Sequence, residues 1–443
     1  MKIDDIKTTE IRFWPVFSVA TVIALLSAVE ELVDEIITGN LFDDVAFSAF
    51  NILEPYQWSI TLLIYLMIVG SASLSVRALG KGDKERASQI FSHGLTCCLS
   101  IGVLFFLVYT LFSEQMVTLV AGQSEIRPYA LEIVEVQAFT YLILPCHYYF
   151  NVCVLYFGGI TYSYINVFVV TATNLILSIL LGQEFGVVGV ALATTIANTV
   201  GLIVLLAFFI KKENRLRFRP RFEFPLAKKI LGLGLGESSM FTSMIILEYV
   251  VNTIALNRFG VQGVAVVSLV VDCFFAVAYI SEGISEFETI SMNTYIGQKR
   301  QDRFDAIIKK VIKVAILEGA VFSLLYFTLA PFIPEGFGID SEETAVIAAD
   351  CLKLLAIAPI FICIIRITSI FFQYTNRISR CIYGFLFAFG VYPALCFIPF
   401  CWLSLSLSAI GVVLGPIITF LTIYLFCKFV KKEDMFKIDI SQI

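Results

Sequence analysis

Carboxylates recur inside long apolar segments of this chain, where charged side chains are rare. Placing a carboxylate in hydrocarbon costs at least about 2.5–3.5 kcal/mol on insertion scales, so such residues normally face water or the protein interior. The acidic residues within the apolar segments are Glu30, Glu31, Asp34, Glu35, Glu54, Glu132, Glu135, Glu237, Glu248, Asp272, Glu282, Glu286, Glu288, Glu318 and Asp350. Grouped carboxylates repel one another and hold a proton or a sodium ion, which they can exchange for a cationic solute.

Several of these positions are related by a constant spacing. The pairs separated by 218 residues are Glu30 and Glu248, Glu54 and Asp272, and Asp34 and Asn252. Similar strings recur at nearly the same distance, such as RALGKGDKERA at 77–87 and TYIGQKRQDRFDA at 294–306. We therefore expect two parallel repeats, each with acidic residues in its first and second helix.

The segments that carry these residues are each long enough to cross about 30 Å of hydrocarbon. They are expected at 13–38, 46–78, 88–112, 129–157, 162–182, 188–210, 231–257, 264–296, 305–331, 343–373, 379–401 and 408–430. Hydrophobic residues make up 58% of the chain and charged residues only 15%, with a mean hydropathy of +0.88. The sequence predicts an all-α integral membrane protein of twelve transmembrane helices, in two six-helix bundles related by a pseudo-two-fold axis along the membrane normal.

Positive charge is distributed asymmetrically between the two sides of this arrangement. Of the 31 Lys and Arg residues, 27 fall in the tails and the even-numbered loops, which places both termini in the cytoplasm. The expected domains are a six-helix lobe at 1–210, a basic cytoplasmic linker at 211–229 that lies on anionic headgroups, and a second lobe at 230–443. Residues 1–12 are mixed in charge and precede a long apolar run, so no signal peptide is expected.

The sequence gives little support for nucleic-acid binding, a metal or cofactor site, or an enzyme. The net charge of −5 gives no reason to expect a nucleic-acid partner. The eleven cysteines form no CxxC pair and His93 and His147 are far apart in sequence, so we expect neither a metal site nor a cofactor. The sequence has no HExxH motif, and the G-x-S string at 236–238 has no well-placed histidine partner, so an enzyme is not expected.

Polar residues near the first-lobe carboxylates are further candidates. Asn51 lies close to Glu54, and Asn174 and Ser178 lie in the fifth span, where cavity lining and simple bridging between helices are equally open. Glu31 and its acidic neighbours could also be merely solvated near the outer interface.

Two further expectations concern charges of the second lobe. Asp350 and Lys353 are three residues apart and can pair on one helix face. Glu286 and Glu288 are expected to be solvated or paired with the basic residues that follow their span.

The chain resembles the multidrug and toxic compound extrusion (MATE) family, most closely its bacterial branches. The resemblance is carried by LVDEIITGNLFDDVAFSAF, GSASLSVRALGKGDKERA, TNLILSILLGQEFGVVGVALATTIAN and GVQGVAVVSLVVDCFFAVAYISEGISEFETISMNTYIGQKRQDR. It implies two six-helix lobes, alternating access, and export of organic cations across the plasma membrane in exchange for H⁺ or Na⁺. The transporter is expected to be a monomer.

The resemblance also implies roles for single residues. Asp34 matches the first-helix aspartate thought to bind the coupling ion, and Asn174 matches the fifth-helix asparagine. Ser178 stands where many relatives carry an aspartate, and Glu54 could supply that missing charge, so Na⁺ could bind at Asp34 and Glu54. Glu248 is a candidate match to the seventh-helix glutamate of other branches.

Two other transporter types remain as alternatives. A flippase of lipid-linked substrates shares the general fold but would favour a cationic cavity, whereas the expected interior here is acidic. A major-facilitator transporter also has twelve spans, but GKGDKERA lacks the second glycine–arginine pair of its helix-two loop.

Overall fold

The computed structural model describes residues 11–26, 49, 53–121, 127–211, 214, 216–218, 223–336, 341–431 and 434–442. These residues contain no strand, and ten of their helices are long and apolar enough to span a membrane, or up to eleven if one bent pair forms a single span. The expected all-α integral membrane fold is confirmed. Of the first expected span, only the helix Phe13–Leu26 lies within the described residues.

The chain divides into two compact units between Gly234 and Leu235. The first unit contains five spanning helices among its described residues. They are α3 (Glu54–Gly80), α4 (Lys84–Leu111), α6 (Arg127–Tyr156), α7 (Ile160–Phe185), and α8 (Val187–Leu206) with its 3₁₀ extension η2 (Ala207–Ile210); α5 (Ser113–Ala121) is a shorter helix.

The remaining spans lie in the second unit, except that the first residues of α9, up to Gly234, belong to the first unit. The first of them are α9 (Phe224–Ile280), α10 (Glu282–Gln298) and α11 (Gln301–Leu329). The bent pair α13 (Glu342–Leu355) and α14 (Ala358–Tyr374) follows. The last two spans are α15 (Ile378–Leu386) continued by η4 (Phe387–Val391) and α16 (Tyr392–Leu403), and α17 (Leu405–Leu425) continued by η5 (Phe426–Lys431). Shorter helices lie at α12 (Ile333–Gly336) and η6 (Ile440–Gln442).

Two of these helical segments are interrupted at a glycine or just before a proline. Gly260 has φ 67°, a left-handed conformation that favours glycine, and it interrupts α9 between the seventh and eighth spans. The expected tenth span is broken between α13 and α14, which are bent by 49°, and Pro359 lies in the first turn of α14. Proline is tolerated at that position because the amide it lacks would have no helical partner.

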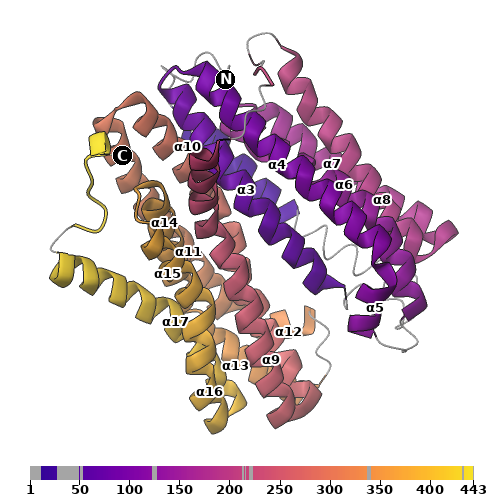
Figure 1. Ribbon diagram of the computed structural model, residues 1–443. Helices are drawn as coiled ribbons and strands as arrows, with labels where there is room; N and C mark the ends of the chain where they lie inside the picture. The colour runs from indigo at the N-terminus through magenta and orange to yellow at the C-terminus, as the bar shows by residue number, and fades with distance from the viewer. Residues whose placement is uncertain are drawn as a thin grey trace. The chain divides into compact units, whose positions relative to one another are not determined.

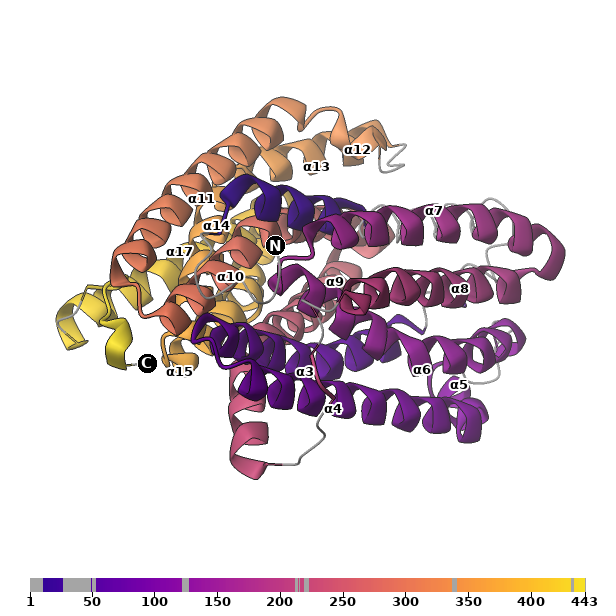
Figure 2. The same ribbon diagram turned by 90° about the horizontal axis from the view of Figure 1, so that it is seen from above.

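Figure 1 shows the long helices of the first unit running alongside one another, and Figure 2 shows that they pack in the order α4, α6, α8, α7. The opposite face of α4 carries large apolar side chains that are exposed, namely Leu99, Val103, Leu104, Leu107 and Leu111. An apolar outer surface of this kind is what a helix facing lipid requires.

In the second unit, α14 lies against α10, α11, α15 and α17 (Figure 2). Gly319 of α11 makes one of these approaches possible, since a Cβ atom there would lie 2.5 Å from the Cα atom of Ile360. Small residues allow such close packing in membranes, where helix association depends on van der Waals contact. As a result α14 is almost completely enclosed, and polar side chains on it must find partners within the unit.

The basic linker packs against the start of α4 where it is described. The backbone amide of Arg217 donates to Ser88 Oγ at 3.3 Å, and Arg86 Nη1 lies 3.0 Å from Glu223 Oε2. These contacts hold the linker close to the first unit. Its expected position on lipid headgroups stays a prediction.

Candidate functional site

A buried arginine organises the polar interior of the second unit. Arg366 on α14 is only 2% exposed, and it contacts α9 and α10 at once. Its Nε donates to Ser285 Oγ at 2.9 Å, its Nη1 donates to Met240 Sδ at 3.0 Å, and its Nη2 lies 3.5 Å from Glu282 Oε2. One guanidinium therefore links three helices of the unit.

Three carboxylates interact with this guanidinium, and a fourth interacts with one of the three. Besides Glu282, the carboxylates of Glu237 on α9 and Glu318 on α11 interact electrostatically with Arg366, and Glu288 on α10 interacts with Glu237. We call these five residues the Arg366 cluster. The cluster contains four acidic side chains and one guanidinium, so its carboxylates outnumber its fixed positive charges.

Local sequence explains how the cluster assembles. Glu282, Ser285 and Glu288 recur every three residues along α10, which places them on neighbouring parts of its surface. Gly236 brings α9 close to its neighbours, because a Cβ atom there would lie 2.8 Å from Cys381 Sγ and from the side chain of Gln373. Glu237 follows on the same helix, and its Oε2 atom is buried.

Three carboxylate oxygens of the cluster lack hydrogen-bond donors among the described residues. They are Oε2 of Glu237, Oε2 of Glu288 and Oε2 of Glu318. Glu288 is 1% exposed, so the expectation that it would be solvated, or paired with the basic residues after its span, was wrong. Enclosure of α10 by other helices of the unit, which linear charge patterning cannot reveal, is the physical reason.

A separate polar column runs through the first unit. His147 on α6 is buried, and its Nε2 lies 3.1 Å from Asn166 Oδ1 on α7; Asn166 Nδ2 in turn donates to Asn151 Oδ1 at 3.3 Å. With Nε2 as the donor, the other ring nitrogen Nδ1 has no proton, and it has no hydrogen-bond partner in the described part of the chain. Asn198 of α8 lies beside the same ring.

The column continues between α6, α7 and α8. Thr140 Oγ1 and Thr195 Oγ1 are 2.6 Å apart, and Asn174 Nδ2 donates to Thr194 Oγ1 at 3.1 Å. Ser178, one turn after Asn174, is completely buried. Of the two fifth-span candidates, Asn174 thus belongs to the polar column, and Ser178 is buried on the same helix.

The remaining first-lobe candidates cannot be placed. Glu31, Asp34 and Asn51 lie outside the described residues, and Glu54 begins α3 with a side chain that is not described. Their roles, including Na⁺ binding at Asp34 and Glu54, stay predictions.

The second-lobe candidates are distributed along α9. Asn252 Oδ1 accepts a hydrogen bond from Ser268 Oγ at 3.3 Å, which joins the two spans on either side of Gly260. Glu248 is half-buried, whereas Asp272 is exposed. On α13, the expected ion pair is confirmed, with Lys353 Nζ 2.9 Å from Asp350 Oδ1.

Sequence reasoning missed two functional candidates. Arg366 was recognised as a charge within a span but received no role, and His147 was considered only as a possible metal ligand. A single arginine in an apolar span is by itself a signal of an interior charge site. The histidine gave no such signal, because its amide neighbours come from other helices.

Comparison with known proteins matches this chain to a family and to named relatives. The chain matches the MatE family over residues 20–180 and 239–398. It is 23% identical over 339 residues to the multidrug export protein MepA of Staphylococcus saprophyticus, a match that covers 75% of this chain and 74% of that protein. It is also 24% identical over 183 residues to the probable multidrug resistance protein NorM of Photorhabdus laumondii, with 40% of each protein covered.

Solved structures agree over almost the whole chain. The structure of a MATE protein in complex with MaL6 superposes with a TM-score of 0.86 at 20% identity, covering 98% of this chain and 99% of that one. A MOP superfamily transporter from Pyrococcus furiosus, for which reversed polarity of the binding pocket suggests a different function, gives 0.84 at 20% identity with 98% and 96% covered. At this identity the likeness concerns the fold alone.

Proposed function

This chain belongs to the MatE family of membrane transporters, and we propose that it is a secondary antiporter that exports organic cations in exchange for H⁺ or Na⁺. It acts as a monomer by alternating access in the plasma membrane, with both termini in the cytoplasm. The relatives named above are called multidrug export or resistance proteins, which is consistent with export of small organic molecules.

The observation that carries this proposal is the excess of carboxylates over guanidinium in the Arg366 cluster. Uncompensated carboxylates in low dielectric are stabilised by a bound cation, so the site favours species of positive charge. The first-lobe acids Asp34 and Glu54 would add a second acidic region. An antiporter needs such sites, because the coupling ion and the solute must each be bound and released in turn.

A flippase of lipid-linked substrates is the second candidate, since it would share the general fold. Its anionic headgroup would require a cationic site. The buried charge of the second unit is mainly acidic, which favours the cation exporter. Membership of the MatE family removes the major-facilitator alternative.

Efflux of a fluorescent organic cation from cells that lack their own pumps tests the proposal. Wild type is compared with Asp34→Asn and Glu54→Gln at matched membrane expression. Glu114→Gln serves as the control, because Glu114 is an exposed acid on the short helix α5. We expect wild type and the control to export the dye and at least one of the other variants to stall.

Failure of wild type to export any of several organic cations would contradict the proposal. Reconstituted vesicles containing lipid-linked substrates would then test the flippase. Labelling of single cysteines placed in the tails, from either side of the membrane, checks the expected orientation.

A further inference from the structure

Residues 434–442, the last described part of the chain, cross two turns of the second unit. One turn lies between α10 and α11, where Gln301 begins α11. The other lies between α14 and α15, where Arg377 directly precedes α15. The two turns are far apart in sequence, yet this stretch contacts both of them. We call residues 434–442 the C-terminal segment.

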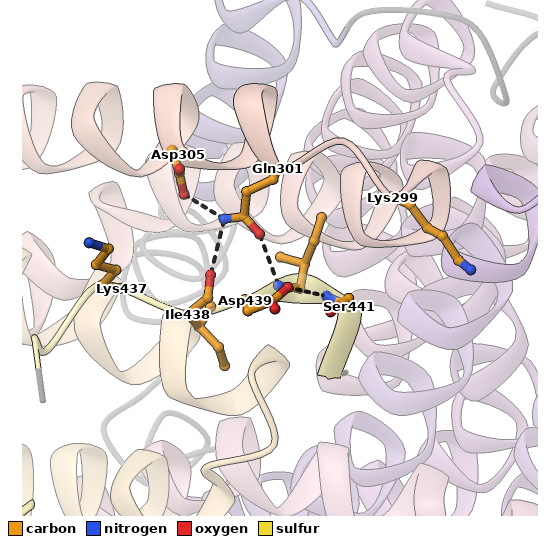
Figure 3. Close-up of a pocket in the computed structure, with 8 residues that line it drawn as sticks. Lys299, Gln301, Asp305, Lys437, Ile438, Asp439 and Ser441 are labelled. Atoms are coloured by element: carbon orange, nitrogen blue, oxygen red, sulfur yellow. Dashed lines mark hydrogen bonds between the residues drawn. The ribbon is translucent and has the colours of Figure 1, made fainter.

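Gln301 binds the far end of the C-terminal segment with both groups of its side-chain amide. Its Nε2 donates to the carbonyl of Ile438 at 3.0 Å, and its Oε1 accepts from the amide of Ile440 at 2.9 Å (Figure 3). Nε2 also donates to Asp305 Oδ1 at 2.7 Å, one turn further along α11, which fixes the orientation of the amide. Ile440 itself is only 5% exposed. One polar and one apolar side chain therefore anchor this end.

The near end of the segment lies against the turn between α14 and α15. Arg377 Nη1 donates to the carbonyl of Met435 at 3.4 Å, and Met435 is 8% exposed. The ring of Phe436 meets that of Phe371 in the last turn of α14, with centroids 5.5 Å apart and planes at 66°. Edge-to-face packing of this kind is favourable between aromatic rings. This end is thus held mainly by apolar contact.

The segment completes a closed circuit of contacts. Phe371 of α14 also packs on Phe304 of α11, with ring centroids 6.3 Å apart, and both rings are completely buried. The circuit runs from α11 to α14 through these rings, from α14 to the segment through Phe436, and back to α11 through Gln301. The start of α11 is therefore tied to the end of α14 both directly and through the segment.

Both turns contain a residue in an unfavourable backbone conformation. Lys299 has φ 58° and Asn376 has φ 61°, and they are the two non-glycine residues with positive φ in the described part of the chain. Left-handed backbone is costly for such residues and persists where neighbouring contacts hold it. The C-terminal segment binds Gln301 and Arg377, which follow them closely. Its docking therefore helps to hold both turns in place.

Few contacts have to break for the segment to come away. Lys437 and Asp439, between its two anchored ends, are exposed. They line a hollow of about 540 Å³ together with Lys299 and Asp305, so the charges around this hollow balance. A segment with few buried contacts opens locally before the rest of a fold does. The C-terminal segment can therefore leave while the spans stay folded.

We propose that the C-terminal segment is a releasable restraint that keeps the starts of α11 and α15 together while it is docked and lets them move apart when it is released. Its contacts are independent of the antiport function proposed above, and only its effect on export rests on that function. Alternating access requires helix ends to move, so a docked segment slows export and its release speeds export.

Hydrogen–deuterium exchange of the purified full chain in lipid nanodiscs tests the restraint. Gln301→Leu and Phe436→Ala each break one end of the segment, and the control Lys437→Gln changes an exposed residue between the ends. We expect each of the first two variants to raise exchange about tenfold at both turns, including the turn that it does not touch. The control should exchange at the wild-type rate. Faster exchange at the altered end alone, or no change, would overturn the inference.

Export of ethidium by the same proteins at matched membrane expression is the second measurement. The initial rate should rise in Gln301→Leu and in Phe436→Ala and stay at the wild-type value in Lys437→Gln. Equal or lower rates in the first two variants would contradict the restraining role. If wild type exports no cation, the antiport function fails, and the exchange measurement still decides whether the C-terminal segment joins the two turns.

Discussion

The guanidinium of Arg366 and the carboxylate of Glu282 lie 3.5 Å apart, although they belong to α14 and α10 and are far apart in sequence. The pair joins a side chain that is 3% exposed, that of Arg366, to one that is 29% exposed, that of Glu282. Because this ion pair lies inside the second unit, the stability of that unit should depend on the balance between its buried acidic and basic side chains.

Replacement of the buried guanidinium should destabilise the protein strongly. In Arg366→Met the carboxylates of Glu237, Glu282 and Glu318 lose the guanidinium with which they interact, and breaking a buried ion pair in this way costs about 3–5 kcal/mol. Thermal unfolding in detergent measures the change. The control Lys353→Met removes a cation whose pair with Asp350 is about half exposed, for which about 0–1 kcal/mol is expected. Equal unfolding temperatures for the two variants would contradict a central role for Arg366.

The packing of the polar column in the first unit should depend on a single glycine, Gly201. In Gly201→Ala the new methyl group would lie 2.7 Å from Asn166 Oδ1 and 2.8 Å from His147 Nε2, and would also meet Val170. Overpacking of this kind costs about 1–3 kcal/mol, and thermal unfolding of the purified protein measures it. Ile203→Ala on the exposed face of the same helix is the control. A rise in stability from the better helix propensity of alanine would contradict this, because it would show that the neighbouring side chains can shift to accommodate the methyl group.

The C-terminal segment should detach when one glutamine is replaced. Gln301 Nε2 donates to the carbonyl of Ile438 at 3.0 Å, and the amide of Ile440 donates to Gln301 Oε1 at 2.9 Å (Figure 3). These contacts close one side of a hollow of about 540 Å³ at the start of α11. Gln301→Leu removes both hydrogen bonds, a loss of about 1–3 kcal/mol when partners are left unsatisfied.

Limited proteolysis measures the release of this segment. Cleavage within residues 434–442 should be much faster in Gln301→Leu than in wild type. Lys437→Gln, an exposed change in the same segment, should cleave at the wild-type rate. Identical rates for all three proteins would show that the segment is held elsewhere, for example by Arg377 Nη1 and the carbonyl of Met435 at 3.4 Å.

The same segment should respond to acid. The Asp439 carboxylate accepts a hydrogen bond from the amide of Ser441 at 2.9 Å, and hydrogen bonding to Ser441 lowers the pKa of Asp439. A carboxyl whose pKa is lowered by folding stabilises the folded form above its unfolded pKa, and loses that contribution as the pH falls through its folded pKa. We expect proteolysis of the segment in wild type to rise only in buffer more acidic than the ordinary pKa of an aspartate, and to be less dependent on pH in Asp439→Asn. The reverse order would contradict the assigned partner.

Much of the fold could be predicted because the bilayer restricts it. Long apolar runs, the asymmetric placement of Lys and Arg, and the recurrence at 218 residues predicted the spans and the two repeated halves. Within the described residues the structure confirms most helices close to the expected bounds, whereas the expected tenth span is broken before Pro359. The interruption at Gly260 reflects the backbone freedom of glycine, which can be read from the sequence.

The candidate site could be predicted only in part. The sequence identified the buried acids as unusual, and it identified Asn174 and Ser178, but it misjudged Glu288 and gave Arg366 and His147 no role. Residue types and their spacing along one helix follow from the sequence, since helix geometry is local. Which helices enclose α10 and α14, and therefore which charges share a low-dielectric interior, depends on contacts between distant segments, so only the tertiary structure decided it.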